Sequence, residues 1–186
     1  LYQFKVLNEA EELSRKLVTS KPNYPGAYRL LAFIYRDKNK KTEAIEAMRQ
    51  EVKNHPQNNK FIIQLAELLM GYELWEDAVT ELTKVSNLPP PSKAPEFRED
   101  KVRSYLLLAR CYRAGTKLES AEGVIKLALE IDANDPELHR EAGYVYHGLQ
   151  RDKEAYKAFE FYLSRSPAAQ DAEPVRTLMR TLAIDQ

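Results

Sequence analysis

This chain has few glycines, a single cysteine and no net charge. Six glycines in 186 residues disfavour a sheet-rich fold, which needs many tight turns. The single cysteine, Cys111, cannot form a disulfide within the chain, and its place in an apolar helical pattern predicts a small core residue rather than a reactive thiol. Lys and Arg total 28, as do Asp and Glu, so the chain lacks the basic excess that a nucleic-acid-binding protein needs.

Long apolar runs are missing as well. No stretch approaches the roughly 18 apolar residues of a membrane-spanning helix, and the first residues lack the charged start, apolar stretch and cleavage site of a signal peptide. The hydrophobic and charged fractions, 44% and 30%, are typical of a soluble protein. We therefore expect no membrane insertion of this segment, and both a cytoplasmic and a periplasmic location stay open.

The residues that carry catalysis or bind metals do not form any recognisable pattern. His55, His139 and His147 include no pair four residues apart, and one cysteine cannot build a zinc site. Phosphate-binding loops, dinucleotide-binding glycine motifs and nucleophile elbows are missing too. The sequence therefore predicts neither an enzyme nor a cofactor or metal site.

What is present is a repeated amphipathic pattern, seen most clearly in residues 136–167. Its first half has apolar side chains at helical spacing: Leu138, Ala142, Val145, Tyr146 and Leu149. Its second half repeats that spacing with Ala155, Ala158, Phe159, Tyr162 and Leu163. The pattern predicts two short helices joined by a polar turn, neither of which can bury its apolar face alone.

Small residues recur through the chain with a period of 34. The small residue of the first helix is found at Ala32, Ala66, Ala109 and Gly143, and the alanine that opens the second helix at Ala44, Ala78, Ala121 and Ala155. A period of 34 residues is that of the tetratricopeptide repeat (TPR), and the chain closely resembles that family. The resemblance implies an all-α solenoid, a right-handed superhelix of antiparallel helix pairs, whose work is to bind other proteins.

Several positions depart from the family pattern. Glu51 replaces a small residue, and Ala133 replaces the usual proline; we expect Pro136, behind an Asp135 N-cap, to open the following helix instead. Nine extra residues separate Ala78 from Ala121, within the proline-rich stretch 87–100. This insertion is interpreted as a surface spacer that lengthens the next helix, with a partner contact as the alternative.

The repeats divide the whole chain. Residues 1–24 are expected to be a truncated repeat, with the end of a first helix at 1–4 and a second helix at 8–18. Full repeats are expected at 25–58, 59–92, 102–135 and 136–169, with the insertion and helix extension at 93–101. The apolar stripe of Val175, Leu178, Met179 and Leu182 predicts a capping helix within 170–186, which covers the last repeat.

In the family that the chain resembles, the first helices line a concave groove. The residues that the register places there are the expected partner contacts: Arg29, Phe33, Arg36, Lys60, Ile63, Met70, Arg103, Leu106, Arg110, Arg113, Arg140, Tyr144 and His147. The register also places three acidic residues, Asp37, Glu67 and Glu137, along the groove, and the basic residues outnumber them. This predicts a protein or peptide partner that mixes acidic and apolar residues, with Arg110, Arg113 and Arg140 exposed and close together.

Two other functions remain open. The array could self-associate through its N-terminal face, where Leu7, Leu13 and Leu17 lack part of their cover. It could also be a regulatory part of a larger enzyme or of a secretion or pilus assembly protein. The sequence does not identify the partner or the cellular process.

Overall fold

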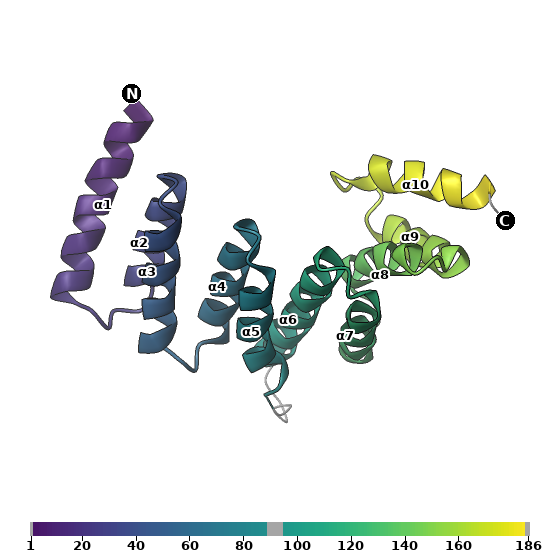
Figure 1. Ribbon diagram of the computed structural model, residues 1–186, viewed down its shortest axis with the longest axis horizontal. Helices are drawn as coiled ribbons and strands as arrows, with labels where there is room; N and C mark the ends of the chain where they lie inside the picture. Colours follow the sequence, from purple (N-terminus) through teal and green to yellow (C-terminus); the bar gives the residue numbers. More distant parts are fainter. Residues whose placement is uncertain (1, 89–94, 185–186) are drawn as a thin grey trace. The chain divides into compact units, whose positions relative to one another are not determined.

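The computed structural model describes residues 2–88 and 95–184, and within them the chain is all helical (Figure 1). The ten helices of these residues are α1 (Tyr2–Ser20), α2 (Ala27–Asp37), α3 (Lys41–Asn54), α4 (Asn59–Gly71), α5 (Trp75–Ser86), α6 (Pro95–Ala114), α7 (Leu118–Ile131), α8 (Pro136–Gly148), α9 (Asp152–Arg165) and α10 (Ala172–Ile184). The predicted all-α fold is confirmed. The prolines of the expected spacer, Pro89, Pro90 and Pro91, lie outside the described residues.

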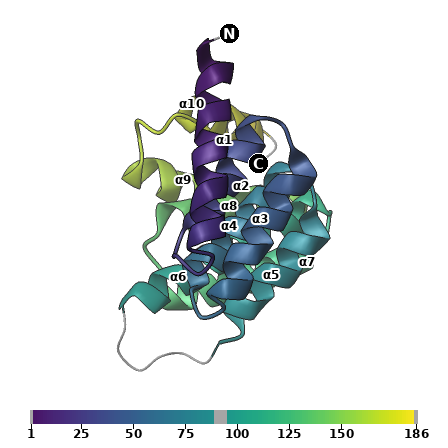
Figure 2. The same ribbon diagram turned by 90° about the vertical axis from the view of Figure 1, so that its left-hand side faces the viewer.

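The helices form two compact units, Leu1–Val85 and Ser86–Gln186. In the first unit, α1 packs against α2 and α2 against α3 (Figure 2). In the second, the closest pairs are α6 with α7 and α8 with α9, and α10 packs on α9. None of the helices in 2–88 and 95–184 is both long and apolar enough to cross a membrane.

The positions predicted to allow close helix approach are buried. Ala32, Ala66 and Ala109 have no exposed surface, and neither do the four alanines that open the second helices. Gly143 is buried against the ring of Phe159. The structure therefore confirms the period of 34 as the packing register of the helices. Burial raises the pKa of Cys111 to about 11, which keeps this core residue a thiol.

Each complete helix pair turns through one residue with a positive φ angle. These residues are Asn39, Glu73, Thr116 and Gln150, with φ between 58° and 61°. The amide that follows each of them donates to a carbonyl five residues earlier, as Lys40 does to Tyr35 and Lys117 to Tyr112. This closes the helix in a Schellman motif, in which glycine is the usual residue. Here non-glycine residues adopt the left-handed conformation at a cost of about 1 kcal/mol each. The packing of the helix pair holds the turn in this conformation.

The start of the chain differs from the prediction. Tyr2–Ser20 is one continuous helix, so the expectation of a separate first helix at residues 1–4 is wrong for the described residues. Counting back 34 residues from the turn residue Asn39 leads to Lys5, which lies inside α1. The stretch holds no glycine or proline to end a helix. Lys38 instead fixes α1 against α2, donating to Asn8 at 2.6 Å and to Glu11 at 2.5 Å.

Two helix starts show how the departures from the repeat pattern are accommodated. Asp135 caps α8 as predicted, its carboxylate accepting the amides of Glu137 and Leu138, with Pro136 in the first turn. At the start of α2, Gly26 adopts φ 87° and no side chain of its own caps the helix. The cap comes from α3, where the fully buried Glu51 carboxylate accepts three amides. They belong to Gly26 at 2.6 Å, Tyr28 at 2.9 Å and Arg29 at 3.1 Å.

We expect Glu51→Gln to lower the free energy of unfolding by about 1 to 2 kcal/mol. The amide keeps one oxygen acceptor, but its NH2 group then faces backbone N–H donors, leaving at least one of them unsatisfied. Thermal or urea denaturation followed by circular dichroism measures the change. Glu46→Gln, on an exposed part of the same helix, is the matched control and should stay within about 0.5 kcal/mol of the parent. Equal losses in the two variants would show that the cap contributes nothing.

Candidate functional site

The first-helix residues of the first unit form a pocket between α2 and α4. It has a volume of about 290 Å³ and is lined by Phe33, Arg36, Gln64, Glu67, Leu68, Gly71 and Tyr72. The guanidinium of Arg36 lies 5.0 Å from the centre of the Phe33 ring and pairs with Asp37 at 2.8 Å. Two of the predicted contact residues, Phe33 and Arg36, are thus brought together. We call this feature the α2–α4 pocket.

The remaining predicted residues of the first unit lie outside this pocket. Lys60 is exposed, Met70 is half-buried, and Arg29 lies over the ring of Phe61 at 5.6 Å. Sequence reasoning missed Gln64 and Tyr72 as site residues. The helical period places Gln64, Glu67 and Gly71 on one face of α4, so this spacing could have identified part of the pocket.

Two of the predicted apolar contacts belong to the core. Ile63 is 7% exposed and Leu106 is 2% exposed, so the expectation that they offer apolar surface to a partner is wrong for the chain as it stands. Leu106 packs with Val102, Ala128 and Leu138. A first helix that lies between neighbouring helices is buried on more than one side, which widens its apolar face beyond the single stripe that the register assigned to the core.

In the second unit, arginines and carboxylates from α6, α8 and the turn before α10 form one network. Arg110 Nη2 donates to Glu137 at 2.8 Å, and Arg113 Nε donates to Glu141 at 2.5 Å. Arg140 Nη1 donates to Asp171 at 2.8 Å. We call this network the arginine cluster; it comprises Arg103, Arg110, Arg113, Arg140, Glu137, Glu141 and Asp171.

Glu141 is the anchor of the cluster. Its side chain is only 2% exposed, and Arg110 Nε lies 3.6 Å from its second oxygen. A buried carboxylate is costly unless charged donors surround it, so Arg110 and Arg113 are held in place by the charge they neutralise. Sequence reasoning did not include Glu141 among the acidic residues of the groove, although it lies four residues after Glu137 and therefore on the same side of α8.

Asp171 was missed for a different reason. It lies in the turn between α9 and α10, and only the tertiary fold brings it to Arg140 and to the Tyr162 hydroxyl, which donates to it. Burial alone would raise the pKa of Asp171, but the Tyr162 hydroxyl and the Arg140 guanidinium outweigh that effect and hold it below its usual value. The carboxylate is therefore ionised at neutral pH and fixes Arg140.

The expectation that these arginines face solvent freely is wrong. The side chains of Arg110, Arg113 and Arg140 are 22%, 38% and 21% exposed, and each is paired with a carboxylate. Arg103 is 42% exposed and lies 3.7 Å from Glu137. The cluster therefore carries a smaller positive excess than the sequence count indicated, because Glu141 and Asp171 add two acidic groups to it.

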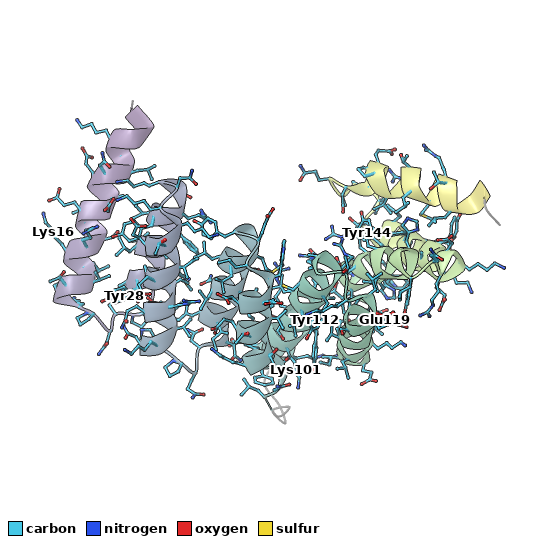
Figure 3. All side chains as sticks on the ribbon, in the orientation of Figure 1. Lys16, Tyr28, Lys101, Tyr112, Glu119 and Tyr144 are labelled. Carbon is cyan, nitrogen blue, oxygen red and sulfur yellow. The ribbon has the colours of Figure 1, made fainter. Side chains whose placement is uncertain are left out.

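Tyr144 supplies an aromatic surface beside the cluster. It lies on α8 on the side that faces α10 (Figure 3), packing edge-on against Phe159 with ring centres 5.1 Å apart. The Arg113 guanidinium lies 5.3 Å from the centre of its ring. Burial raises the pKa of Tyr144, so its hydroxyl stays protonated and can donate or accept a hydrogen bond. The last predicted contact, His147, is exposed and contacts Asp152 at 3.2 Å instead of the cluster.

Within residues 2–88 and 95–184, no group of His, Cys, Asp or Glu side chains is arranged to hold a metal ion. For recognition, the described side chains offer arginine forks, aromatic rings and hydrogen-bonding groups. The α2–α4 pocket and the arginine cluster each bring several of these groups together.

Comparison with known proteins agrees with this architecture. The family model of the tetratricopeptide repeat matches residues 25–57 and 102–135. No curated protein sequence matches the chain significantly. Among solved structures, PilW, a type IV pilus biogenesis factor, is 17% identical with a TM-score of 0.75, over 98% of this chain and 80% of that one.

Two further structures carry the repeat in their names. YrrB, a TPR protein with an unusual peptide-binding site, is 17% identical with a TM-score of 0.67, over 95% of this chain and 87% of that one. A tetratricopeptide repeat protein from Parabacteroides merdae is 19% identical with a TM-score of 0.73, over 98% of this chain and 70% of that one. At such identities these likenesses concern the fold, which is that of a TPR helical solenoid, and the family model places tetratricopeptide repeats at residues 25–57 and 102–135 of this chain.

Proposed function

We propose that this TPR protein is an interaction scaffold that binds a segment of a partner protein at the arginine cluster and Tyr144. The partner segment mixes acidic and apolar residues. The fold supports this proposal, since TPR proteins bind other proteins and YrrB has a peptide-binding site. The likeness to PilW makes an assembly role, such as pilus biogenesis, one setting in which a scaffold of this kind works.

The observation that carries the proposal is the fixed geometry of Arg113. Its Nε and Nη2 groups both face Glu141, at 2.5 and 3.5 Å. No described residue accepts a hydrogen bond from its Nη1 group, so this part of the planar fork can donate to a partner carboxylate. The side chain is already held by Glu141 and by Tyr144, so little conformational entropy remains to be lost on binding.

Peptide titration tests the proposal. A fluorescent peptide in which Glu and Leu alternate should bind, a peptide with Lys in place of Glu should not, and added salt should weaken binding because exposed charges are screened beyond about 8 Å. Arg113→Lys keeps a positive charge beside Glu141 but removes the planar fork. We expect it to weaken binding of the acidic peptide about tenfold, the loss of one charged hydrogen bond, while circular dichroism shows an unchanged fold.

Arg176→Lys is the matched control. Arg176 lies on α10 and pairs with Glu173 and the Pro167 carbonyl, outside the cluster, so this variant should bind the peptide like the parent. Equal binding of the Glu and Lys peptides, or equal losses in the two variants, would place the interaction elsewhere.

Self-association is the second candidate function. On α1, Leu13 is 66% exposed and Val6 is 46% exposed, while Leu7 and Leu17 are half-buried. Exposed apolar side chains at helical spacing are typical of a helix face that contacts another surface. A concentration series by sedimentation, with Leu13→Lys as the comparison, separates this candidate from partner binding, since only a self-associating chain shows a mass that falls on dilution and in the variant.

A further inference from the structure

The walls of the α2–α4 pocket contain buried polar atoms without hydrogen-bond partners. Gln64 Oε1 and the Tyr72 hydroxyl are each cut off from solvent and make no hydrogen bond within the described chain. Both residues line the pocket. Buried polar groups in native proteins are almost always paired, so two unpaired ones around a single pocket indicate groups that are satisfied by something the pocket binds.

The size of the pocket limits what can enter. Its volume of about 290 Å³ is at the lower end of ligand sites, which span roughly 300 to 1,000 Å³. It is large enough for one side chain or a molecule of similar size, and too small for a helix. Phe33, Leu68 and Gly71 provide the apolar part of its lining, which suits a side chain with an apolar stem.

The polar lining limits the chemistry. Gln64 Oε1 only accepts hydrogen bonds, so the bound group must donate one, while the Tyr72 hydroxyl can donate one in return. The charged lining residues, Arg36 and Glu67, have opposite signs. A charged ligand would lose its hydration in the pocket, and the lining has no excess of opposite charge to compensate for that cost. The lining therefore favours a neutral group with both a donor and an acceptor.

We propose that the α2–α4 pocket binds the carboxamide side chain of an Asn or Gln residue in the partner segment. The carboxamide NH2 donates to Gln64 Oε1, and its oxygen accepts from the Tyr72 hydroxyl, with small rotations of both side chains exposing these atoms to the ligand. The apolar stem lies against Phe33 and Leu68. This inference extends the proposed scaffold function to a second site, in the first unit, and does not depend on the acidic preference of the arginine cluster.

Nuclear magnetic resonance with small blocked amino acids tests the pocket directly. N-acetyl-glutamine methylamide should shift the amide resonances of Gly71 and Tyr72 and the side-chain amide of Gln64. N-acetyl-glutamate methylamide and N-acetyl-norleucine methylamide should shift them much less. The glutamate side chain has no hydrogen-bond donor at neutral pH, and the norleucine side chain has no polar atom. Equal shifts from all three probes, stronger shifts from the glutamate probe, or no shifts at all would overturn the carboxamide assignment.

Tyr72→Phe distinguishes a binding group from a structural one. Because the hydroxyl is buried without a partner, its removal should leave the melting temperature unchanged or raise it, while weakening the glutamine probe about tenfold. Tyr105→Phe is the matched control: the Tyr105 hydroxyl donates to the Ser86 carbonyl at 3.4 Å, so its loss should lower the melting temperature and leave probe binding unchanged. A Tyr72→Phe protein that melts lower and binds the probe normally would make the hydroxyl structural and contradict the proposal.

Gly71→Leu blocks the pocket by another route. A Cβ atom at Gly71 meets no other atom within 4 Å, so a leucine can be accommodated there without displacing the backbone, and its side chain narrows the pocket. The glutamine probe should lose its effect while the fold remains. Gly123→Leu, on α7 and equally free of contacts, should leave binding intact. Unchanged probe binding in Gly71→Leu would show that the site lies elsewhere.

Discussion

Deletion of residues 172–186 is expected to lower the free energy of unfolding of the second unit by about 4 kcal/mol. The deletion removes α10, whose Val175 and Leu182 are almost fully buried against Phe159 and Tyr162 of α9. Full burial of one such side chain contributes about 1.5 to 3 kcal/mol. Since a domain is stable by only about 5 to 15 kcal/mol, the loss is a large part of the total.

Hydrogen exchange measured along the chain shows where the loss occurs. In a stack, stability is roughly a sum of repeat and neighbour terms, so exchange should accelerate first in α9, which α10 covers, and least in α2 and α3. Thr177→Ala, on an exposed part of α10, should leave exchange unchanged. An even rise along the whole chain would contradict the role of α10 as a cap.

Gly143→Leu should destabilise the same unit by about 3 kcal/mol, the upper part of the range for overpacked cores. Even a Cβ atom at this position would lie 2.5 Å from Phe159 Cδ1 and 2.8 Å from its Cζ, which is far inside van der Waals contact. The ring cannot simply move away, because Phe159 has no exposed surface and also packs against Tyr144. Chemical denaturation followed by circular dichroism measures the loss.

Two further variants test the cause of that loss. Gly123→Ala lies in a helix with open space at the Cβ position and should stabilise the protein by up to about 1 kcal/mol, the difference in helix propensity. The double variant Gly143→Leu with Phe159→Ala should lose less stability than the sum of the two single losses, because the second change makes room for the first. Strict additivity would show that the two residues do not conflict.

The sequence alone determined the helices and their packing register. Each repeat carries apolar residues at helical spacing and a small residue at a fixed position, and both features are local properties of the chain. The alanines that recur at the repeat spacing accordingly have no exposed surface. The cap on α8 was predictable for the same reason, since Asp135 contacts amides only two and three residues away.

Only the tertiary structure decided which polar side chains meet. Glu51 caps a helix whose N-cap residue, Gly26, lies 25 residues earlier. Arg113 pairs with Glu141 across 28 residues, and Arg140 pairs with Asp171 across 31. A period specifies which face of a helix is buried, but the partner of a charged side chain depends on where two helices lie in space.

The α2–α4 pocket and the arginine cluster depend on the same kind of information. The sequence placed Phe33 and Arg36 on one helix face, but the residues that complete the pocket, Gln64 and Tyr72, come from the next repeat. Likewise the arginines and Glu137 were placed in the groove, while the other two carboxylates that hold them, Glu141 and Asp171, were left out. Apolar spacing follows from the geometry of a single helix, whereas a recognition site is made by side chains from several helices, so its composition is fixed only when those helices pack.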